Sequence, residues 1–210
     1  MRDSSQHAHA AFQVALPVEG DEVAVMDASG VCHRGAALAV RPMTPHRMLT
    51  RKDVLTFFIE PQCAFADELR ARCGQGITVA GDLRGLREED VRRAGAHPSG
   101  ALDPRLRAAM GLATERDMPM PGLAARVGLS PQRLRALARH QLGMPLTRWR
   151  MWARLRRTVE ALEDGHTLAG AAVIGGFADQ AHFTRCMREL TGVTPASVLP
   201  LLRAHSRRAV

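Results

Sequence analysis

The sequence lacks the features that would assign it to several large classes of protein. It has no apolar run that approaches the length of a membrane-spanning helix, and its first residues, MRDSSQHAHA, form no apolar secretion signal. It also has no P-loop, no G-x-G-x-x-G motif and no nucleophile elbow. We therefore expect a cytoplasmic protein that has no contact with a membrane and is not an enzyme.

Cysteine is scarce and is not arranged in pairs. The four cysteines are Cys32, Cys63, Cys73 and Cys186, and none of them forms a C-x-x-C pair. Isolated thiols in a chain of this length are typical of reduced cytoplasmic cysteines rather than of a disulfide framework or a zinc knuckle. The remaining composition, 46% hydrophobic and 24% charged, is ordinary for a globular protein of one or two domains.

Positive charge is present in excess, and it is unevenly distributed. Residues 1–100 carry 12 basic and 13 acidic side chains, whereas residues 101–210 carry 17 basic and 8 acidic ones. The net charge of +8 therefore arises entirely in the second half of the chain. A basic half joined to a near-neutral half indicates a polyanion-binding module with a sensor or partner-binding region attached.

The hydrophobic pattern changes along the chain from strands to helices. Four short apolar runs separated by turn residues predict strands at 11–18, 22–27, 36–42 and 54–60. Helical spacing then predominates, and the turn formers at 96–102 suggest a boundary. We predict an α+β chain with three regions: a small antiparallel, truncated β unit over 1–62, a helical connector over 63–102, and an all-α domain over 103–210.

The helical half contains an internal repeat. The stretch LAARVGLSPQRLRALARHQLG, which begins at Leu123, aligns with LAGAAVIGGFADQAHFTRCMRELTG, which begins at Leu168. Each copy reads as a short helix, a glycine-apolar turn, a capped start and a second helix, which is the layout of a helix-turn-helix. Ser130 is a suitable N-cap, and Pro131 fits the first helical position because its missing N–H costs nothing there.

Both second helices are predicted to be amphipathic. In the first copy Leu134, Leu137 and Ala138 share the apolar face, and in the second Phe183 and Met187 do so. The small residues Ala124 and Ala172 suit the crossing point of the paired helices. An apolar stripe from Leu146 to Leu162 predicts a longer helix between the two copies.

Residues 103–199 resemble the DNA-binding domain of the AraC/XylS family of bacterial transcription regulators. The resemblance rests on the tandem repeat, on the intervening LTRWRMWARLRRTVEAL, and on the GF turn followed by G-x-T-P at residues 192–195. It implies two three-helix units bridged by the helix near 145–164, which holds the recognition helices about 34 Å apart, one DNA turn. Double-stranded DNA is the implied partner, and the family also suggests RNA polymerase, a small-molecule effector and a homodimer.

The resemblance also assigns roles to exposed side chains of the helices near 131–141 and 180–190. Arginine pairs with guanine and glutamine with adenine in the major groove, whereas other basic residues contact phosphates. The base-reading candidates are Gln132, Arg135, Gln180, Thr184 and Arg185. The phosphate-binding candidates are Arg133, Arg139 and Arg188.

The first half of the chain contains a set of histidines in a suggestive order. His7, His9, Gln13 and His46 follow the order of the metal motif of cupins, H-x-H-x3-E and then a later His. Gln13 replaces the usual carboxylate, which weakens a metal site. We expect a vestigial pocket that binds a ligand or nothing, with neither metal nor other cofactor.

Two alternatives to a sequence-specific regulator follow from the same residues. One is a metal-dependent cupin-like enzyme with a DNA-binding appendix, which requires a bound metal at the histidines. The other is a nucleic-acid binder without sequence preference, which predicts equal affinity for all DNA at the same salt concentration. The duplicated polar helix faces favour the regulator.

Overall fold

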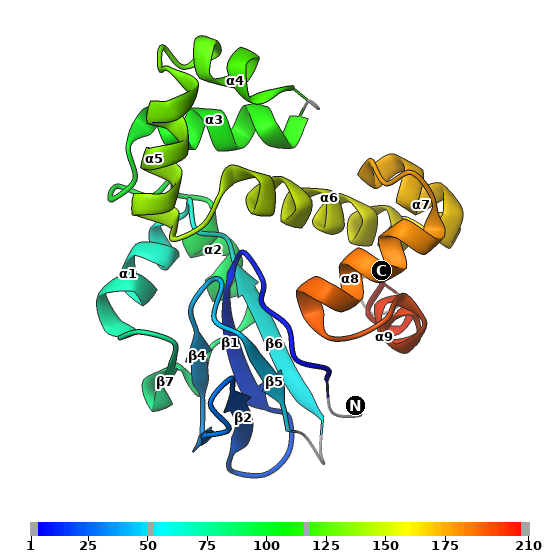
Figure 1. Cartoon of the computed structure of the whole chain (residues 1–210). Coiled ribbons are helices and arrows are strands. Elements are labelled where there is room, and N and C mark those ends of the chain that lie inside the picture. Colours follow the sequence, from blue (N-terminus) through cyan, green and yellow to red (C-terminus); the bar gives the residue numbers. More distant parts are fainter. Residues whose placement is uncertain (1–3, 50–52, 116–117, 207–210) are drawn as a thin grey trace.

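Short strands dominate the first eighty residues and helices dominate the rest of the chain (Figure 1). The structure is a computed structural model that describes residues 4–49, 53–115 and 118–206. Within these residues, no helix is both long enough and apolar enough to cross a lipid bilayer.

The strands form two antiparallel sheets. The larger sheet has the order β6 (Val54–Ile59), β1 (Phe12–Pro17), β4 (Leu38–Val40) and β7 (Ile77–Val79). The smaller has the order β3 (Cys32–Gly35), β2 (Val23–Asp27) and β5 (His46–Met48). Apolar side chains from both sheets pack together in one buried cluster: Ala15, Val23, Val25, Leu38 and Met48. Burial of this cluster holds the two sheets against each other.

Helix α1 (Ala64–Arg72) lies against the larger sheet. Its buried Phe65 and Leu69 belong to the same hydrophobic cluster as Phe12 and Phe57 of the sheet. The predicted helical connector over 63–102 also contains α2 (Glu88–Gly95), the 3-10 helix η1 (Gly81–Leu83) and, unexpectedly, strand β7. This region therefore extends the β part and does more than link it to the helices.

The helical part consists of two similar units on either side of one long helix. The first comprises α3 (Pro104–Glu115), α4 (Met120–Arg126) and α5 (Pro131–Leu142). The second comprises α7 (Leu168–Gly175), α8 (Gln180–Thr191) and α9 (Pro195–Ser206). Between them runs α6 (Leu146–Glu163), whose 18 residues extend over about 27 Å.

One continuous hydrophobic core runs along α6 and reaches into both units. Trp149 and Trp152 lie in it, together with Leu134 of the first unit and Phe183 of the second. At the crossing of α6 and α7, a Cβ on Gly175 would lie only 1.8 Å from Thr158 Oγ1, so the close approach of these helices requires glycine. The predicted apolar faces of α5 and α8 are confirmed, with Leu134, Ala138, Phe183 and Met187 all buried.

The predicted strands are confirmed, and three further strands were not predicted. These are β3, β5 and β7, which have only three or four residues each. β3 alternates exposed and half-buried residues, so it has no apolar pattern that the sequence could reveal. Strand β3 forms a hairpin with β2, whereas β5 and β7 form because strands farther away in the chain pair with them.

Candidate nucleic-acid interface and histidine cluster

The two helix-turn-helix units repeat the same local hydrogen bonds. After the first helix of each unit, Leu129 N–H donates to Ala124 C=O and Phe177 N–H donates to Ala172 C=O, both at 2.9 Å. Both turns contain a glycine with positive φ, +65° at Gly128 and +89° at Gly176. Ala124 and Ala172 are fully buried, as the helix crossings require. The duplication predicted from the sequence is therefore present in the backbone.

Each second helix begins at the predicted cap. Ser130 Oγ accepts a hydrogen bond from Arg133 N–H at 3.2 Å, and Pro131 occupies the first helical position of α5. Asp179 Oδ1 accepts from His182 N–H at 2.6 Å at the start of α8. These caps satisfy backbone donors that the first turn leaves free, and they fix where the exposed side chains begin.

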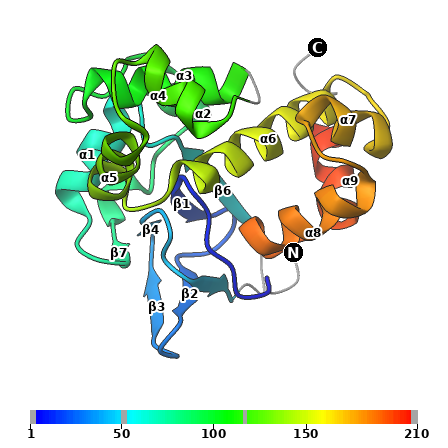
Figure 2. The same ribbon diagram turned by 45° about the horizontal axis from the view of Figure 1, so that its top comes forward.

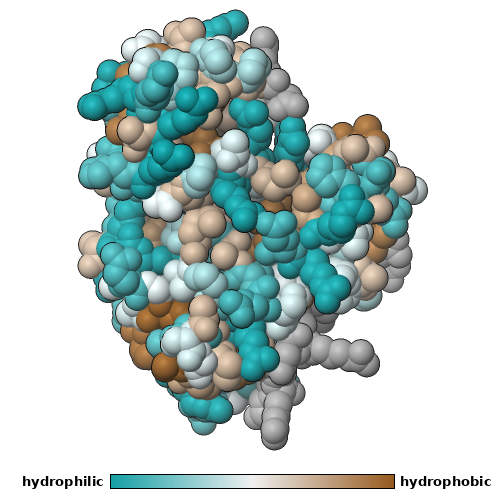
Figure 3. Space-filling view, in the orientation of Figure 1, coloured by the Kyte–Doolittle hydropathy of each residue, from teal (hydrophilic) through white to brown (hydrophobic). Residues whose placement is uncertain are grey.

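The candidate DNA-contacting residues lie on the outer faces of α5 and α8. In α5 the side chains Gln132, Arg133, Arg135 and Arg139 are exposed, and in α8 the exposed ones are Gln180, Arg185 and Arg188. Thr184 is half-buried, and its hydroxyl donates to the Gln180 carbonyl at 2.8 Å. That hydroxyl can therefore only accept from a base. Hydrophilic residues gather over α5 at the upper left of Figure 3.

Helices α5 and α8 are not parallel. In Figure 2, α5 is seen nearly along its axis, whereas α8 lies across the view. Major-groove positions one turn apart on straight DNA are related by a translation along the duplex, so two helices that dock alike must be parallel. In this conformation α5 and α8 therefore do not fit neighbouring grooves of a straight duplex at the same time.

The N-terminal segment, residues 4–9, contacts the second unit at the end of α8. Ser5 N–H and Ser5 Oγ donate to the Gly192 carbonyl at 3.0 and 3.1 Å. A Cβ on Gly192 would lie 2.5 Å from both His7 Nδ1 and Ser5 O, so the segment packs closely on this turn. Figure 1 shows the segment running between the sheets and α8. No local sequence pattern predicts this contact.

A cavity of about 510 Å³ lies between the β part and the second unit. Its walls are formed mainly by apolar side chains from β6, α6, α8 and the α9 region, including Phe58, Trp152, Leu155 and Val198. His7 and Gln13 line it as well. The position brings any bound molecule into contact with both halves of the chain.

One charged pair lines this cavity. Arg156 Nη1 lies 2.9 Å from Glu60 Oε1, yet neither Glu60 Oε1 nor Arg156 Nε has a hydrogen bond of good geometry. Burial is the main cause that raises the pKa of Glu60, and the nearby Arg156 opposes it. Buried polar atoms of this kind are available to a polar group of a ligand. Neither residue belongs to a motif that the sequence reveals.

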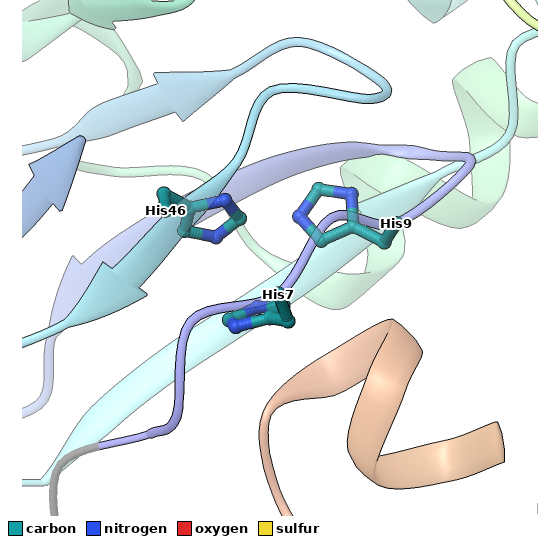
Figure 4. A group of neighbouring side chains, drawn as sticks. All are labelled: His7, His9 and His46. Carbon is teal, nitrogen blue, oxygen red and sulfur yellow. The ribbon is translucent and has the colours of Figure 1, made fainter. Parts of the chain in front are cut away.

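The four residues of the predicted vestigial pocket come together in space. His7, His9 and His46 each offer a ring nitrogen, and these atoms lie within 4.8 Å of one another (Figure 4). All three side chains are buried. Gln13 Oε1 lies 2.8 Å from His9 Nε2 and 2.9 Å from His46 Nε2. His7 and His46 are further joined by a pair of backbone hydrogen bonds of 2.9 Å each.

Burial also disfavours protonation of these rings. Desolvation is the main cause in each case, and it lowers the pKa of His9 to about 4 and that of His46 to about 3. The pKa of His7 is lowered as well. The rings are therefore neutral at physiological pH, with one lone pair each.

Comparisons with known proteins support the helix-turn-helix units and the overall fold. Residues 123–199 match a family described as a helix-turn-helix domain. Over 97% of this chain and 95% of the other, the structure is similar to ToxT from Vibrio cholerae O395, with 13% identity and a TM-score of 0.63. Unsaturated fatty acid bound wild-type ToxT from V. cholerae strain SCE256 is similar over 96% and 91%, with 11% identity and a TM-score of 0.61.

A third structure is similar over about half of this chain. It is a transcriptional regulator with an AraC-type DNA-binding domain from Chromobacterium violaceum, with 23% identity over 48% of this chain and 93% of that one, at a TM-score of 0.45. No curated protein sequence matches the chain. The similarity to ToxT shows a shared α+β fold over nearly the whole chain.

Proposed function

We propose that the chain is a DNA-binding transcription regulator of the AraC type, and that α5 and α8 enter two successive major grooves of one duplex. The observation that carries this is the duplicated unit: two capped helices with buried apolar faces and exposed polar faces at opposite ends of α6. We assign DNA binding to residues 103–210, sensing to the β unit over 1–62, and a connecting role to 63–102.

Base reading falls to side chains on the outer faces of both helices. We assign it to Gln132, Arg135, Gln180, Thr184 and Arg185, because amide and guanidinium groups form paired hydrogen bonds with purine edges. Arg133, Arg139 and Arg188 contact phosphates, which adds affinity and salt dependence but no sequence information. The exposure of all three arginines supports this role.

Simultaneous binding requires the second unit to turn relative to the first. Since α5 and α8 are not parallel here, only one of them can enter a major groove of a straight duplex in the docking orientation. The hydrogen bonds from Ser5 to Gly192 and the Arg156–Glu60 ion pair both join the β part to the helical part near the second unit. We propose that these contacts hold the second unit in its present orientation and that their loss favours the DNA-bound one.

The cavity between the halves is the proposed effector site. Its walls suit an apolar body, and the incompletely bonded Arg156 and Glu60 suit a polar head group. The similar ToxT structure that carries an unsaturated fatty acid supports an amphipathic small molecule as the class of effector. A ligand that binds one orientation of the second unit better than the other shifts the population between them.

The remaining partners in the proposal come from the family resemblance. A homodimer and contact with RNA polymerase are expected of such a regulator in the cytoplasm. Val173 and Ile174 of α7 are 66% and 49% exposed, and Figure 3 shows hydrophobic surface in the region of α7. Sedimentation equilibrium of the full chain, with and without DNA, measures the stoichiometry.

The experiment for the proposed function is selection of binding sites from random duplexes, followed by affinity measurements on the selected site. Arg185→Ala should relax the preference at one base pair, by about 1–3 kcal/mol. Arg188→Ala should weaken binding to every duplex alike and reduce the salt slope by about one. Arg93→Ala, which removes an exposed arginine of α2, is the control and should change neither.

Two results would count against this assignment. Equal affinity of the wild type for selected and random duplexes at matched salt would favour the binder without sequence preference. Identical losses for Arg185→Ala and Arg188→Ala on all duplexes would remove the division between base and phosphate contacts.

A further inference from the structure

The histidine cluster has an outer hydrogen-bond pattern that fixes its tautomers. His7 Nδ1 lies 2.9 Å from Ser5 O, His9 Nδ1 lies 2.7 Å from Ala11 O, and His46 Nδ1 lies 2.8 Å from Thr44 O. A carbonyl oxygen only accepts, so each Nδ1 carries the proton. Each neutral ring therefore presents Nε2 with a free lone pair. Metal-binding histidines have this arrangement, in which the second ring nitrogen donates to a carbonyl.

The inner side of the cluster consists of acceptors. Nε2 of His9 and Nε2 of His46 both face Gln13 Oε1, at 2.8 and 2.9 Å, and an amide oxygen donates nothing. Gln13 holds this orientation while its Nε2 donates to Met48 Sδ at 3.3 Å. A cation between these rings would bind the lone pairs that converge there.

We propose that His7, His9 and His46 bind one divalent transition-metal ion through Nε2, with Gln13 Oε1 as the fourth ligand. Three imidazoles and one oxygen form a donor set that suits Zn²⁺. Ligands of one tetrahedral Zn²⁺ lie about 3.3 Å apart. The ring nitrogens lie within 4.8 Å of one another, so small ring rotations bring them to the ion. The vestigial pocket expected from the sequence is, on this geometry, a complete site.

The metal site is also joined to the second helix-turn-helix unit. His7 follows Ser5 by two residues, and Ser5 is hydrogen-bonded to Gly192 at the end of α8. An ion held by His7 and His46 ties the N-terminal segment to β5 and thereby strengthens its hold on this turn. Resting on the proposed function, this predicts that metal weakens DNA binding, because it stabilises the orientation in which α5 and α8 are not parallel.

The first test measures metal binding directly, on full-length protein without an affinity tag. Zn²⁺ is titrated into chelator-treated protein by calorimetry, and Co²⁺ by absorption spectroscopy. We expect one ion per chain and the visible absorption of tetrahedral Co²⁺, without the thiolate charge-transfer band that the cysteines would produce. His46→Ala should weaken binding about 100-fold or more, whereas His166→Ala, at an exposed histidine, should leave it unchanged.

A second variant keeps the test decisive if His46→Ala does not fold. Gln13→Glu restores a carboxylate ligand, so it should bind Zn²⁺ about tenfold more tightly than the wild type. It should also show a larger rise in melting temperature on adding Zn²⁺, because the buried carboxylate destabilises the apo protein. No stoichiometric binding by the wild type, or equal affinity in Gln13→Glu and wild type, would overturn the metal site.

The regulatory consequence is tested separately, on a duplex obtained by selection. Saturating Zn²⁺ should lower the affinity of the wild type for this duplex several-fold and leave that of His46→Ala unchanged. Direct metal binding without this effect would overturn the coupling and leave the site intact. Loss of DNA binding in all conditions would instead contradict the proposed function, while the Co²⁺ spectrum would still report on the site.

Discussion

The two helix-turn-helix units have nearly the same local structure but different surroundings. Both have a capped second helix, a buried alanine at the crossing and a left-handed glycine after the second helix. Gly143, after α5, has open space around it, whereas Gly192, after α8, is in close contact with His7 and Ser5. The comparison shows that two units with the same local structure differ in one respect: only the second is in contact with the N-terminal segment, so only the second can be restrained by it.

The largest expected effects are on stability, and they test whether the two units unfold together because they share one hydrophobic core. Phe183→Ala in α8 should destabilise the protein by about 4 kcal/mol and Leu134→Ala in α5 by about 3 kcal/mol, because both side chains are fully buried. Since both belong to one hydrophobic cluster along α6, each variant should lower the midpoint of a single urea transition. Two separate transitions, with only one shifted in each variant, would show that the units fold independently.

Lowering the pH should destabilise the folded protein through two buried histidines of the β part. The pKa of His9 is lowered to about 4 and that of His46 to about 3, mainly by burial, whereas both rings titrate near 6.5 when unfolded. Below pH 6.5 the unfolded chain binds protons that the folded chain does not, so stability falls as the pH falls.

The expected loss is about 1.4 kcal/mol per pH unit and per ring between pH 6.5 and about 4. Urea unfolding of chelator-treated protein at pH 7, 6 and 5 measures it. His46→Gln should reduce the slope substantially. A free energy of unfolding that stays constant from pH 7 to pH 5 would contradict the burial of neutral rings.

The glycines offer a matched pair of smaller changes. Gly143→Ala and Gly192→Ala both place a side chain at positive φ, +71° and +72°, which costs about 1 kcal/mol. Only Gly192→Ala also pushes against His7 and Ser5, so it should displace the N-terminal segment. We expect Gly192→Ala to bind DNA several-fold more tightly than Gly143→Ala in electrophoretic mobility shifts. Equal affinities would show that the contact does not restrain the second unit.

The smallest effects concern the helix caps. Ser130→Ala and Asp179→Ala should each destabilise the protein by about 1 kcal/mol. Asp179 should be the more important cap, because its carboxylate lies closer to its backbone donor, 2.6 against 3.2 Å, and faces the positive end of the helix. Thermal unfolding of the two variants measures the difference, and a larger loss for Ser130→Ala would reverse this ranking.

Local signals explain what the sequence predicts well. Several features involve only residues close together in the chain, so the sequence predicts them. They are the caps at Ser130 and Asp179, the glycine turns and the apolar spacing in α5 and α8. The order of His7, His9, Gln13 and His46 likewise predicts that these residues converge, as they do.

Long-range contacts explain what the sequence does not reveal. Strand β7 is only ITV and forms because β4 pairs with it. The bond between Ser5 and Gly192 joins residues 187 positions apart. Neither this contact nor the packing of both units around α6 has a local pattern that periodicity or capping could show.

The most direct test of the account is a hydroxyl-radical footprint of the full chain on its selected duplex. We expect two protected segments with centres about 10 base pairs apart, one for each recognition helix. Arg135→Ala should weaken protection of one segment and Arg185→Ala that of the other. A single segment that both variants weaken alike, or protection without defined boundaries, would contradict the reading of two successive grooves by the duplicated units.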